Sequence, residues 1–349
     1  MTKEEDRRMQ EDPARGLTRR EFVGAASLAV AAGALAGTVA TGPDAAEAQG
    51  ATRVDVEFMS KGMRCAGYKY LPDGQRAGDR HPVIVMAHGF SAVKEMYFTH
   101  YAEEFRKAGF VVVLFDYRYQ GASQGEPRGQ IFPWEQIEDY RNAITFASLE
   151  PEADPERIGV FGSSYSGAHV ICVGALDRRV KCVAGQVPLI DGWANAQAIN
   201  TRVNLSGFVK YLQADRVERY KTGKVNYLPV VAADNNAVLN TSDSYQWFTE
   251  TAKKMAPRWE NRVTVESLER FIEYTPGAFL PRISPTPFLM MVSETDILTP
   301  TDLAISAFET ARQPKKLVIL PGGHFDAYVK GFPISSGQAV AWFKQHLLG

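Results

Sequence analysis

The chain has 349 residues, of which 45% are hydrophobic, and a formal net charge of −1. This length and apolar content suffice for one large α/β domain or for two smaller domains with separate cores. There is no surplus of Lys and Arg and no long basic run, so the composition excludes a nucleic-acid-binding protein of the usual basic type. The apolar content also excludes an intrinsically disordered chain.

Residues 1–48 have the features of an export signal. Thr18-Arg19-Arg20-Glu21-Phe22 precedes an uncharged run rich in Ala and Gly, and the small residues Ala46 and Ala48 suit a signal peptidase. The pattern resembles a twin-arginine signal. We therefore expect residues 49–349 to act in the periplasm or outside the cell, with no stable membrane insertion after cleavage. A membrane anchor is the alternative interpretation, although Ala and Gly make the run weakly hydrophobic.

The three cysteines, Cys65, Cys172 and Cys182, are few for an oxidising compartment. A protein exported in its folded state acquires its core in the reducing cytoplasm, and this favours buried free thiols over disulfides. A Cys172–Cys182 bridge is the alternative. No CxxC pair or His cluster has the spacing of a zinc site, so we expect no metal and no cofactor.

The chain between 52 and 191 alternates strand and helix patterns. We expect an antiparallel hairpin from 52–60 and 64–71, strands at 82–87, 109–115, 155–162 and 180–187, and helices at 97–108 and 131–149. The C-terminal part adds strands at 287–292 and 315–320 and helices at 301–311 and 335–348. Strands separated by helix-length segments indicate βαβ units. The sequence therefore predicts an α/β fold with a mostly parallel central sheet flanked by helices.

Residues 192–285, which follow the sixth predicted strand, break this alternation. They contain no clear apolar strand but show helical patterns at 211–220, 244–255 and 265–274. A structureless loop of this length is not expected in a compact domain, so we predict an inserted helical cap. We expect most of its aromatic residues to pack the cap against the body and a minority to line a binding pocket. These aromatics include Trp193, Tyr227, Tyr245, Trp247, Phe248 and Trp259.

Residues 162–167 have the sequence GSSYSG and join a predicted strand to a predicted helix. A sharp strand-to-helix turn brings backbone segments close together, which requires small residues, and it lifts its apical residue, Ser164, clear of the sheet. The usual pattern is G-x-S-x-G, and here the second glycine, Gly167, comes one position late. The alternative interpretation is a chance serine-rich turn, or a helix N-cap at Ser163 or Ser164.

A serine hydroxyl becomes a good nucleophile when a base takes its proton and an acid holds that base. Of the six histidines, His324 lies in the glycine-containing loop after the last predicted strand. Catalytic groups of open α/β sheets gather at this carboxyl edge. Asp296 follows the preceding strand and gives the chain order Ser, Asp, His. Glu294 and Asp191 are the alternative acids, whereas Asp326 is too close to His324 to reach round it.

Two backbone amides are expected to bind an oxyanion. Tyr165 opens the predicted helix after Ser164, so its amide has no intrahelical acceptor. Phe90 lies in the loop after the strand at 82–87, where Gly89 allows close approach to the nucleophile. We therefore predict Ser164 as the nucleophile, with an oxyanion hole formed by the amides of Phe90 and Tyr165.

These motifs resemble the α/β-hydrolase superfamily, and most of all its dienelactone-hydrolase-like and X-Pro-dipeptidyl-peptidase-like esterases. The resemblance spans roughly 83–348 and is weak across the cap. It is carried by residues 88–95 (HGFSAVKE), 116–127 (DYRYQGASQGEP), 154–159 (DPERIG) and 162–167, together with Asp296 and His324. The resemblance implies the triad Ser164, Asp296 and His324 and the oxyanion hole of Phe90 and Tyr165. We expect Asp116 and Arg118 to fix a turn, with a catalytic role as the alternative. Dienelactone hydrolases proper use a cysteine nucleophile, which this chain lacks.

The sequence therefore predicts an exported serine hydrolase that cleaves small-molecule carboxylic esters or thioesters through an acyl-enzyme on Ser164. A peptidase or an acyltransferase would use the same triad. The cap would decide between these activities, because it controls which groups enter and whether water is excluded. A non-catalytic binding protein is the hypothesis from another class. Such a protein usually lacks members of the triad, and here all three are present.

Overall fold

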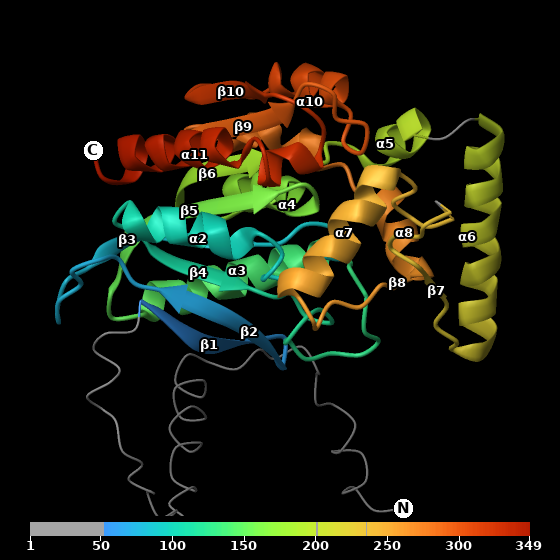
Figure 1. Ribbon diagram of the computed structural model, residues 1–349, viewed down its shortest axis with the longest axis horizontal. Helices are drawn as coiled ribbons and strands as arrows, with labels where there is room; N and C mark the ends of the chain where they lie inside the picture. Colours follow the sequence, from blue (N-terminus) through green and yellow to red (C-terminus); the bar gives the residue numbers. More distant parts are fainter. Residues whose placement is uncertain (1–51, 200–201, 235) are drawn as a thin grey trace, which may run out of the picture. The chain divides into compact units, whose positions relative to one another are not determined.

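The computed structural model describes residues 52–199, 202–234 and 236–349, and the predicted export signal at 1–48 lies outside them. An eight-stranded sheet runs through the described part of the chain in the order β1-β2-β4-β3-β5-β6-β9-β10 (Figure 1). Among the described residues, no helix has both the length and the apolar character needed to cross a membrane.

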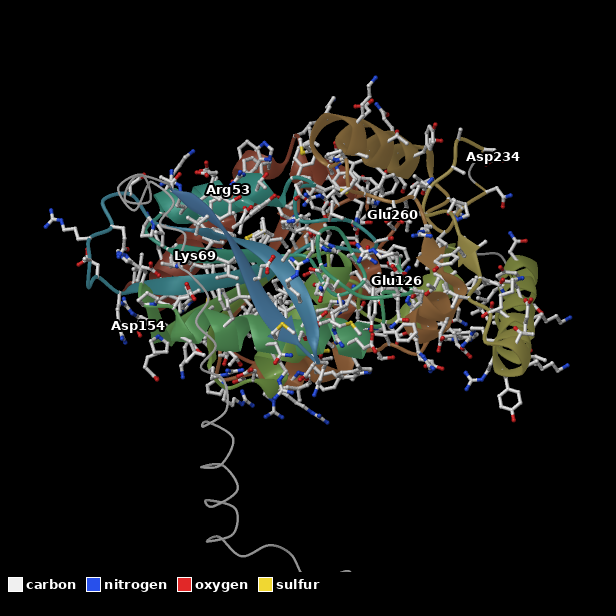
Figure 2. The ribbon with its side chains drawn as sticks, turned by 90° about the horizontal axis from the view of Figure 1, so that it is seen from below. Arg53, Lys69, Glu126, Asp154, Asp234 and Glu260 are labelled. Carbon is white, nitrogen blue, oxygen red and sulfur yellow. The ribbon has the colours of Figure 1, made fainter. Side chains whose placement is uncertain are left out.

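The first two strands form the predicted antiparallel hairpin. β1 (Arg53–Ser60) pairs with β2 (Met63–Tyr70), and β2 pairs antiparallel with β4 (Val111–Phe115). Seen from below, the hairpin crosses in front of the other strands, with Arg53 and Lys69 at the same end of it (Figure 2).

The other strands run parallel, as the alternation of strands and helices predicts. They are β3 (His81–Ala87), β5 (Ala153–Ser163), β6 (Val180–Gln186), β9 (Phe288–Ser293) and β10 (Lys315–Leu320). β4 and β9 are buried at every residue, and β3 at every residue after its first. Burial on both faces of the sheet explains their uninterrupted apolar sequences.

Helices cover both faces of the sheet. α2 (Phe98–Lys107) and α11 (Phe332–Leu347) contact each other on one face, and α3 (Pro133–Leu149) and α4 (Tyr165–Leu176) contact each other on the opposite face (Figure 1). α10 (Thr301–Phe308) packs against β9. α11 begins three residues earlier than predicted, because a proline in its first turn is compatible with a helix N-terminus.

The segment between β6 and β9 is the cap, and its position after the sixth strand is confirmed. Its main helices are α5 (Gly192–Ile199), α6 (Arg202–Thr222), α7 (Ser242–Met255) and α8 (Val265–Ile272), followed by the short helices Pro276–Phe279 and Leu280–Ile283. The predicted cap helices correspond to α6, α7 and α8. The two-residue strands β7 (Tyr227–Leu228) and β8 (Val263–Thr264) were not predicted, because two residues show no period. α5 was not predicted, because it lacks the amphipathic pattern that α8, of equal length, has. In Figure 1, α6 is the outermost cap helix, beyond α8.

The cysteines are all buried and free, which confirms the prediction of free thiols and shows that the alternative Cys172–Cys182 bridge is wrong. Burial raises the pKa of the Cys172 thiol to about 12. The thiol is therefore protonated and unreactive at neutral pH.

Asp116 and Arg118 hold the loop after β4, as expected from the sequence. Asp116 is fully buried and accepts hydrogen bonds from the backbone amide and from Nζ of Lys94, each at 2.8 Å. A Cβ at Gly121, where φ is +49°, would lie 2.2 Å from the Asp116 carboxylate, so the loop closes tightly on this side chain. Arg118 donates from Nε to Asp139 at 2.6 Å. Both side chains thus hold the loop after β4, and Asp116 ties it through Lys94 to the loop after β3 that carries Phe90.

Candidate active site

Ser164 stands at the apex of the sharp turn between β5 and α4. Its φ of 59° and ψ of −118° are strained for a residue with a side chain. The turn is held by the Ser164 amide, which donates to the Gln186 carbonyl at 2.8 Å, and by its carbonyl, which accepts from the Leu189 amide at 3.2 Å. A Cβ at Gly162 would lie 2.3 Å from the carbonyl oxygen of Ser166, so this position needs glycine. Ser164 occupies the N-cap position of α4, but its side chain makes no hydrogen bond that caps the helix.

Ser166 shows how the turn forms without the usual glycine. Its side chain is fully buried, and its hydroxyl lies 2.8 Å from the Tyr140 hydroxyl and 3.1 Å from the Tyr117 hydroxyl. Gly167, the late glycine, is needed for a different reason: a Cβ there would lie 2.8 Å from the Gln186 carbonyl oxygen on β6. The departure from G-x-S-x-G is therefore accommodated by a buried polar network beneath the turn.

His324 and Asp296 form a continuous hydrogen-bonded chain with Ser164. Nε2 of His324 lies 3.0 Å from Oγ of Ser164, and Nδ1 lies 2.7 Å from Oδ2 of Asp296. With Nδ1 donating to the carboxylate, Nε2 is left as an acceptor for the serine proton, which is the tautomer that a general base needs. The structure thus brings together the three side chains that the sequence singles out, each from the carboxyl end of a different strand.

Asp296 is oriented by the turn that follows β9. Its Oδ1 accepts the backbone amides of Leu298 and Thr299, each at 2.9 Å. Its Oδ2 lies 2.9 Å from the Thr299 hydroxyl, and that hydroxyl lies 3.2 Å from Nδ1 of His324. Three donors besides the histidine therefore converge on one carboxylate that is almost completely buried. The sequence analysis did not single out Thr299.

The other acidic residues near the sheet edge have different partners. Glu294 is exposed and contacts the loop after β10. Asp191 accepts from the Ala194 amide at 2.7 Å, at the start of α5. Asp326 accepts from the Gly323 amide at 2.8 Å within its own loop. None of the three is hydrogen-bonded to the histidine, so the geometry favours Asp296 as the acid.

We expect Thr299→Val to lower kcat by about 10-fold or more, with little change in KM, because a hydrogen bond to a charged group typically stabilises by about 1.5–3 kcal/mol. Valine keeps the shape of the side chain but leaves Asp296 less firmly held, so the imidazole is less well oriented. Steady-state kinetics with a chromogenic ester measure the effect. Thr310→Val, in an exposed turn, is the matched control. An unchanged kcat in a folded Thr299→Val protein would show that this hydroxyl does not position the carboxylate.

Phe90 and Tyr165 lie beside Ser164 and line the same cavity. Their rings are in edge-to-face contact, with centroids 5.6 Å apart. Gly89 passes close to the nucleophile, since a Cβ there would lie 3.1 Å from Cβ of Ser164. Within the described ranges, neither backbone amide donates to a protein acceptor. Both amides are therefore free to bind an oxyanion.

A cavity of about 240 Å³ opens over Ser164, lined by residues of the cap and of the sheet edge. Of the six cap aromatics named from the sequence, only Trp247 and Phe248 line it, which confirms that a minority would do so. Phe208 and Phe271, also from the cap, line it as well, and the body contributes further aromatic residues: Phe90, Phe98, Tyr165, Phe325 and Tyr328. No Asp, Glu, Lys or Arg side chain of the described residues lines the cavity. Within the same described ranges, no group of three or more His, Cys, Asp and Glu side chains is placed to hold a metal ion.

The fold and this site define the class of protein. A parallel sheet with a serine on the turn after β5, an aspartate after β9 and a histidine after β10 is the arrangement of the α/β hydrolases. Residues 61–326 match the family described as X-Pro dipeptidyl-peptidase (S15 family), and the chain belongs to this family. The resemblance stated from the sequence is thereby confirmed, and the chain is a hydrolase of the α/β type.

Relatives with assigned names cover most of the chain. Quorum-quenching protein AidA of Acinetobacter baumannii is 31% identical over 79% of this chain and 89% of its own length. Thiohydrolase aneE of Aspergillus aculeatus is 33% identical over 76% of this chain and 84% of its own length. Polyketide transferase grgF of a Penicillium species is 29% identical over 84% of this chain and 97% of its own length. The crystal structure of α/β hydrolase GrgF from Penicillium sp. sh18 superposes with a TM-score of 0.73 at 26% identity, covering 85% of this chain and 99% of that one.

Proposed function

We propose that the protein is a serine hydrolase that cleaves carboxylic esters or thioesters of an uncharged, mainly apolar acyl group. The observation that carries this proposal is the hydrogen-bonded chain from Ser164 through His324 to Asp296 at the base of an apolar cavity. His324 takes the hydroxyl proton as Oγ of Ser164 attacks the acyl carbonyl. The amides of Phe90 and Tyr165 stabilise the oxyanion that forms.

The tetrahedral intermediate collapses when the bond to the leaving oxygen or sulfur breaks. His324 gives its proton to this leaving group, and the acyl group remains on Ser164. His324 then takes a proton from water, whose oxygen attacks the acyl-enzyme. The second collapse releases the carboxylic acid and returns the proton to Ser164, so the enzyme is regenerated without any cofactor.

The lining of the cavity supports an uncharged acyl group. A charged group entering it would lose its hydration and find no side chain of opposite formal charge among the described lining residues. A peptidase that binds a free peptide N-terminus needs a partner for the ammonium group. The site therefore favours ester or thioester cleavage over peptide cleavage, and the name of the relative thiohydrolase aneE supports thioesters as substrates.

Acyl transfer is a second candidate, because the relative grgF is named a polyketide transferase. The same acyl-enzyme would then pass its acyl group to an alcohol or an amine in place of water. Product analysis after incubation with a thioester, with and without an added alcohol, separates the two activities. Formation of the free acid alone in both incubations would count against transfer.

The direct test of the proposed function is labelling with a fluorophosphonate probe, followed by turnover of p-nitrophenyl esters of increasing chain length. We expect the probe to modify Ser164 and the esters with medium-length apolar chains to react fastest, because they fill the apolar cavity. If the folded protein is not labelled and hydrolyses neither esters nor thioesters, the proposal is wrong.

We also propose that residues 1–48 direct twin-arginine export, so that the mature protein begins at Gln49 in the periplasm or outside the cell. Replacing Arg19 and Arg20 together by Lys is expected to leave the uncleaved protein in the cytoplasm, as measured by fractionation and N-terminal sequencing. Arg7 and Arg8, a second arginine pair that no apolar run follows directly, form the matched control. Membrane-bound, uncleaved wild-type protein would instead favour the anchor interpretation.

A further inference from the structure

One polar side chain inside the apolar cavity has no hydrogen-bond partner among the residues that the structure describes. Asn195, on α5, is 4% exposed and lines the same cavity as the nucleophile Ser164. Its backbone amide donates to the Asp191 carbonyl at 2.9 Å, but its side-chain amide makes no hydrogen bond with any described residue. A buried amide without a hydrogen-bond partner lowers the free energy of unfolding, because its lost hydration is not replaced. Its presence therefore needs an explanation.

The other polar groups of the lining are accounted for. The Thr299 hydroxyl is hydrogen-bonded to Asp296, and Asn236 and Asn240 are exposed to solvent. The Trp247 indole N–H also lacks a partner, but this atom is buried and cannot be reached from the cavity. Among the described residues that line the cavity, Asn195 is therefore the enclosed polar side chain that is left to form a hydrogen bond with a bound molecule.

From these observations we propose that Asn195 determines substrate specificity by binding an oxygen substituent, a carbonyl or a hydroxyl, on an otherwise apolar acyl chain. This inference rests on the proposed function and narrows its substrate class. A carboxamide has both donor and acceptor atoms, so it pairs with a ketone through Nδ2 or with a hydroxyl through either atom. A site built to hydrogen-bond one substrate group discriminates strongly against the analogue that lacks it.

The backbone holds Asn195 at a fixed place relative to the nucleophile. Residues 187–191 connect β6 to α5. This segment is tied to the turn of Ser164 by the amide of Leu189, 3.2 Å from the Ser164 carbonyl oxygen. The carboxylate of Asp191 then fixes the start of α5 through the Ala194 amide at 2.7 Å. Both contacts fix the backbone of Asn195 relative to Ser164. The carboxamide of Asn195 therefore meets an acyl group bonded to Ser164 at one carbon position of that acyl group.

The test compares thioesters that differ only in one oxygen atom. N-acetylcysteamine thioesters of octanoic acid and of its oxo derivatives at C3, C5 and C7 are assayed for kcat/KM with the wild-type protein and with Asn195→Leu. We expect one oxo isomer to exceed the octanoyl thioester by about 10-fold in the wild type, as a single hydrogen bond permits. In Asn195→Leu, which has a similar volume and no polar atom, this ratio falls to about one while octanoyl turnover persists.

Asn240→Leu is the matched control, because it removes an exposed amide from the same cavity and is expected to keep the wild-type ratio. Asn195→Ala provides a second variant if the leucine is not tolerated, and fluorophosphonate titration of Ser164 reports an intact site in each protein. A wild-type ratio below about two for every isomer, or a ratio that survives Asn195→Leu, overturns the inference. Such a result leaves the proposed function standing if the octanoyl thioester is hydrolysed, whereas absence of both labelling and turnover in the wild type refutes the function itself.

Discussion

Ser164→Ala is expected to lower kcat/KM for ester hydrolysis by about 10⁴-fold or more and to abolish labelling by a fluorophosphonate probe. The variant keeps the turn between β5 and α4, because alanine preserves the backbone and, among the described residues, the Ser164 side chain is hydrogen-bonded only to His324. It removes the atom to which the acyl group becomes bonded, and no other hydroxyl of the described residues is hydrogen-bonded to Nε2 of His324. Turnover of a p-nitrophenyl ester and mass spectrometry of the labelled protein measure the two effects.

Ser163→Ala is the matched control, because the hydroxyl of Ser163 is hydrogen-bonded to residues other than His324. Oγ of Ser163 donates to the Tyr328 hydroxyl at 2.7 Å and accepts from Nε2 of Gln186 at 3.0 Å, so its loss should cost about 1–3 kcal/mol of stability but leave Ser164 reactive. Full ester turnover in a folded Ser164→Ala protein would exclude the acyl-enzyme and leave the hydrogen-bonded chain without a catalytic role.

The strands and helices of the body could be predicted because each is marked by a pattern within its own segment of the sequence. β3, β4 and β9 are buried along nearly their whole length, and each is an uninterrupted apolar run in the sequence. The order of serine, aspartate and histidine along the chain could also be read directly, because parallel strands bring their carboxyl ends to one edge and each side chain follows such a strand. Element type and order therefore followed from periodicity alone.

The supporting contacts could not be predicted, because they join segments that are distant in the sequence. The hydroxyl of Ser166 is satisfied by Tyr117 and Tyr140, which lie 49 and 26 residues away. The sequence does not show whether the hydroxyl of a core tyrosine is hydrogen-bonded to a distant turn. Thr299 and Asn195 were missed for the same reason: their importance lies in one contact or in the lack of one, and neither leaves a pattern along the chain.

Asp296→Asn is expected to lower kcat by about 10⁴-fold at neutral pH, with a much smaller effect on KM. The carboxylate accepts the Nδ1 proton of His324 at 2.7 Å and so leaves Nε2 free to accept the serine proton. An asparagine held by the same donors, the amides of Leu298 and Thr299, turns its NH₂ group toward Nδ1. Nδ1 must then accept, Nε2 carries the proton, and the imidazole cannot act as the base. Substrate binding depends on the cavity, which this change leaves intact.

Glu294→Gln is the matched control, since it makes the same chemical change two residues earlier at an exposed position of the same strand end. We expect its kcat to remain within about two-fold of the wild type, because surface carboxylates that do not touch the site contribute little. Circular dichroism establishes that both variants are folded. If Asp296→Asn keeps more than a tenth of the wild-type kcat, the orientation of His324 does not depend on this carboxylate. Asp191 would then be the next acid to replace, because the loop that carries it also contacts the nucleophile turn through Leu189.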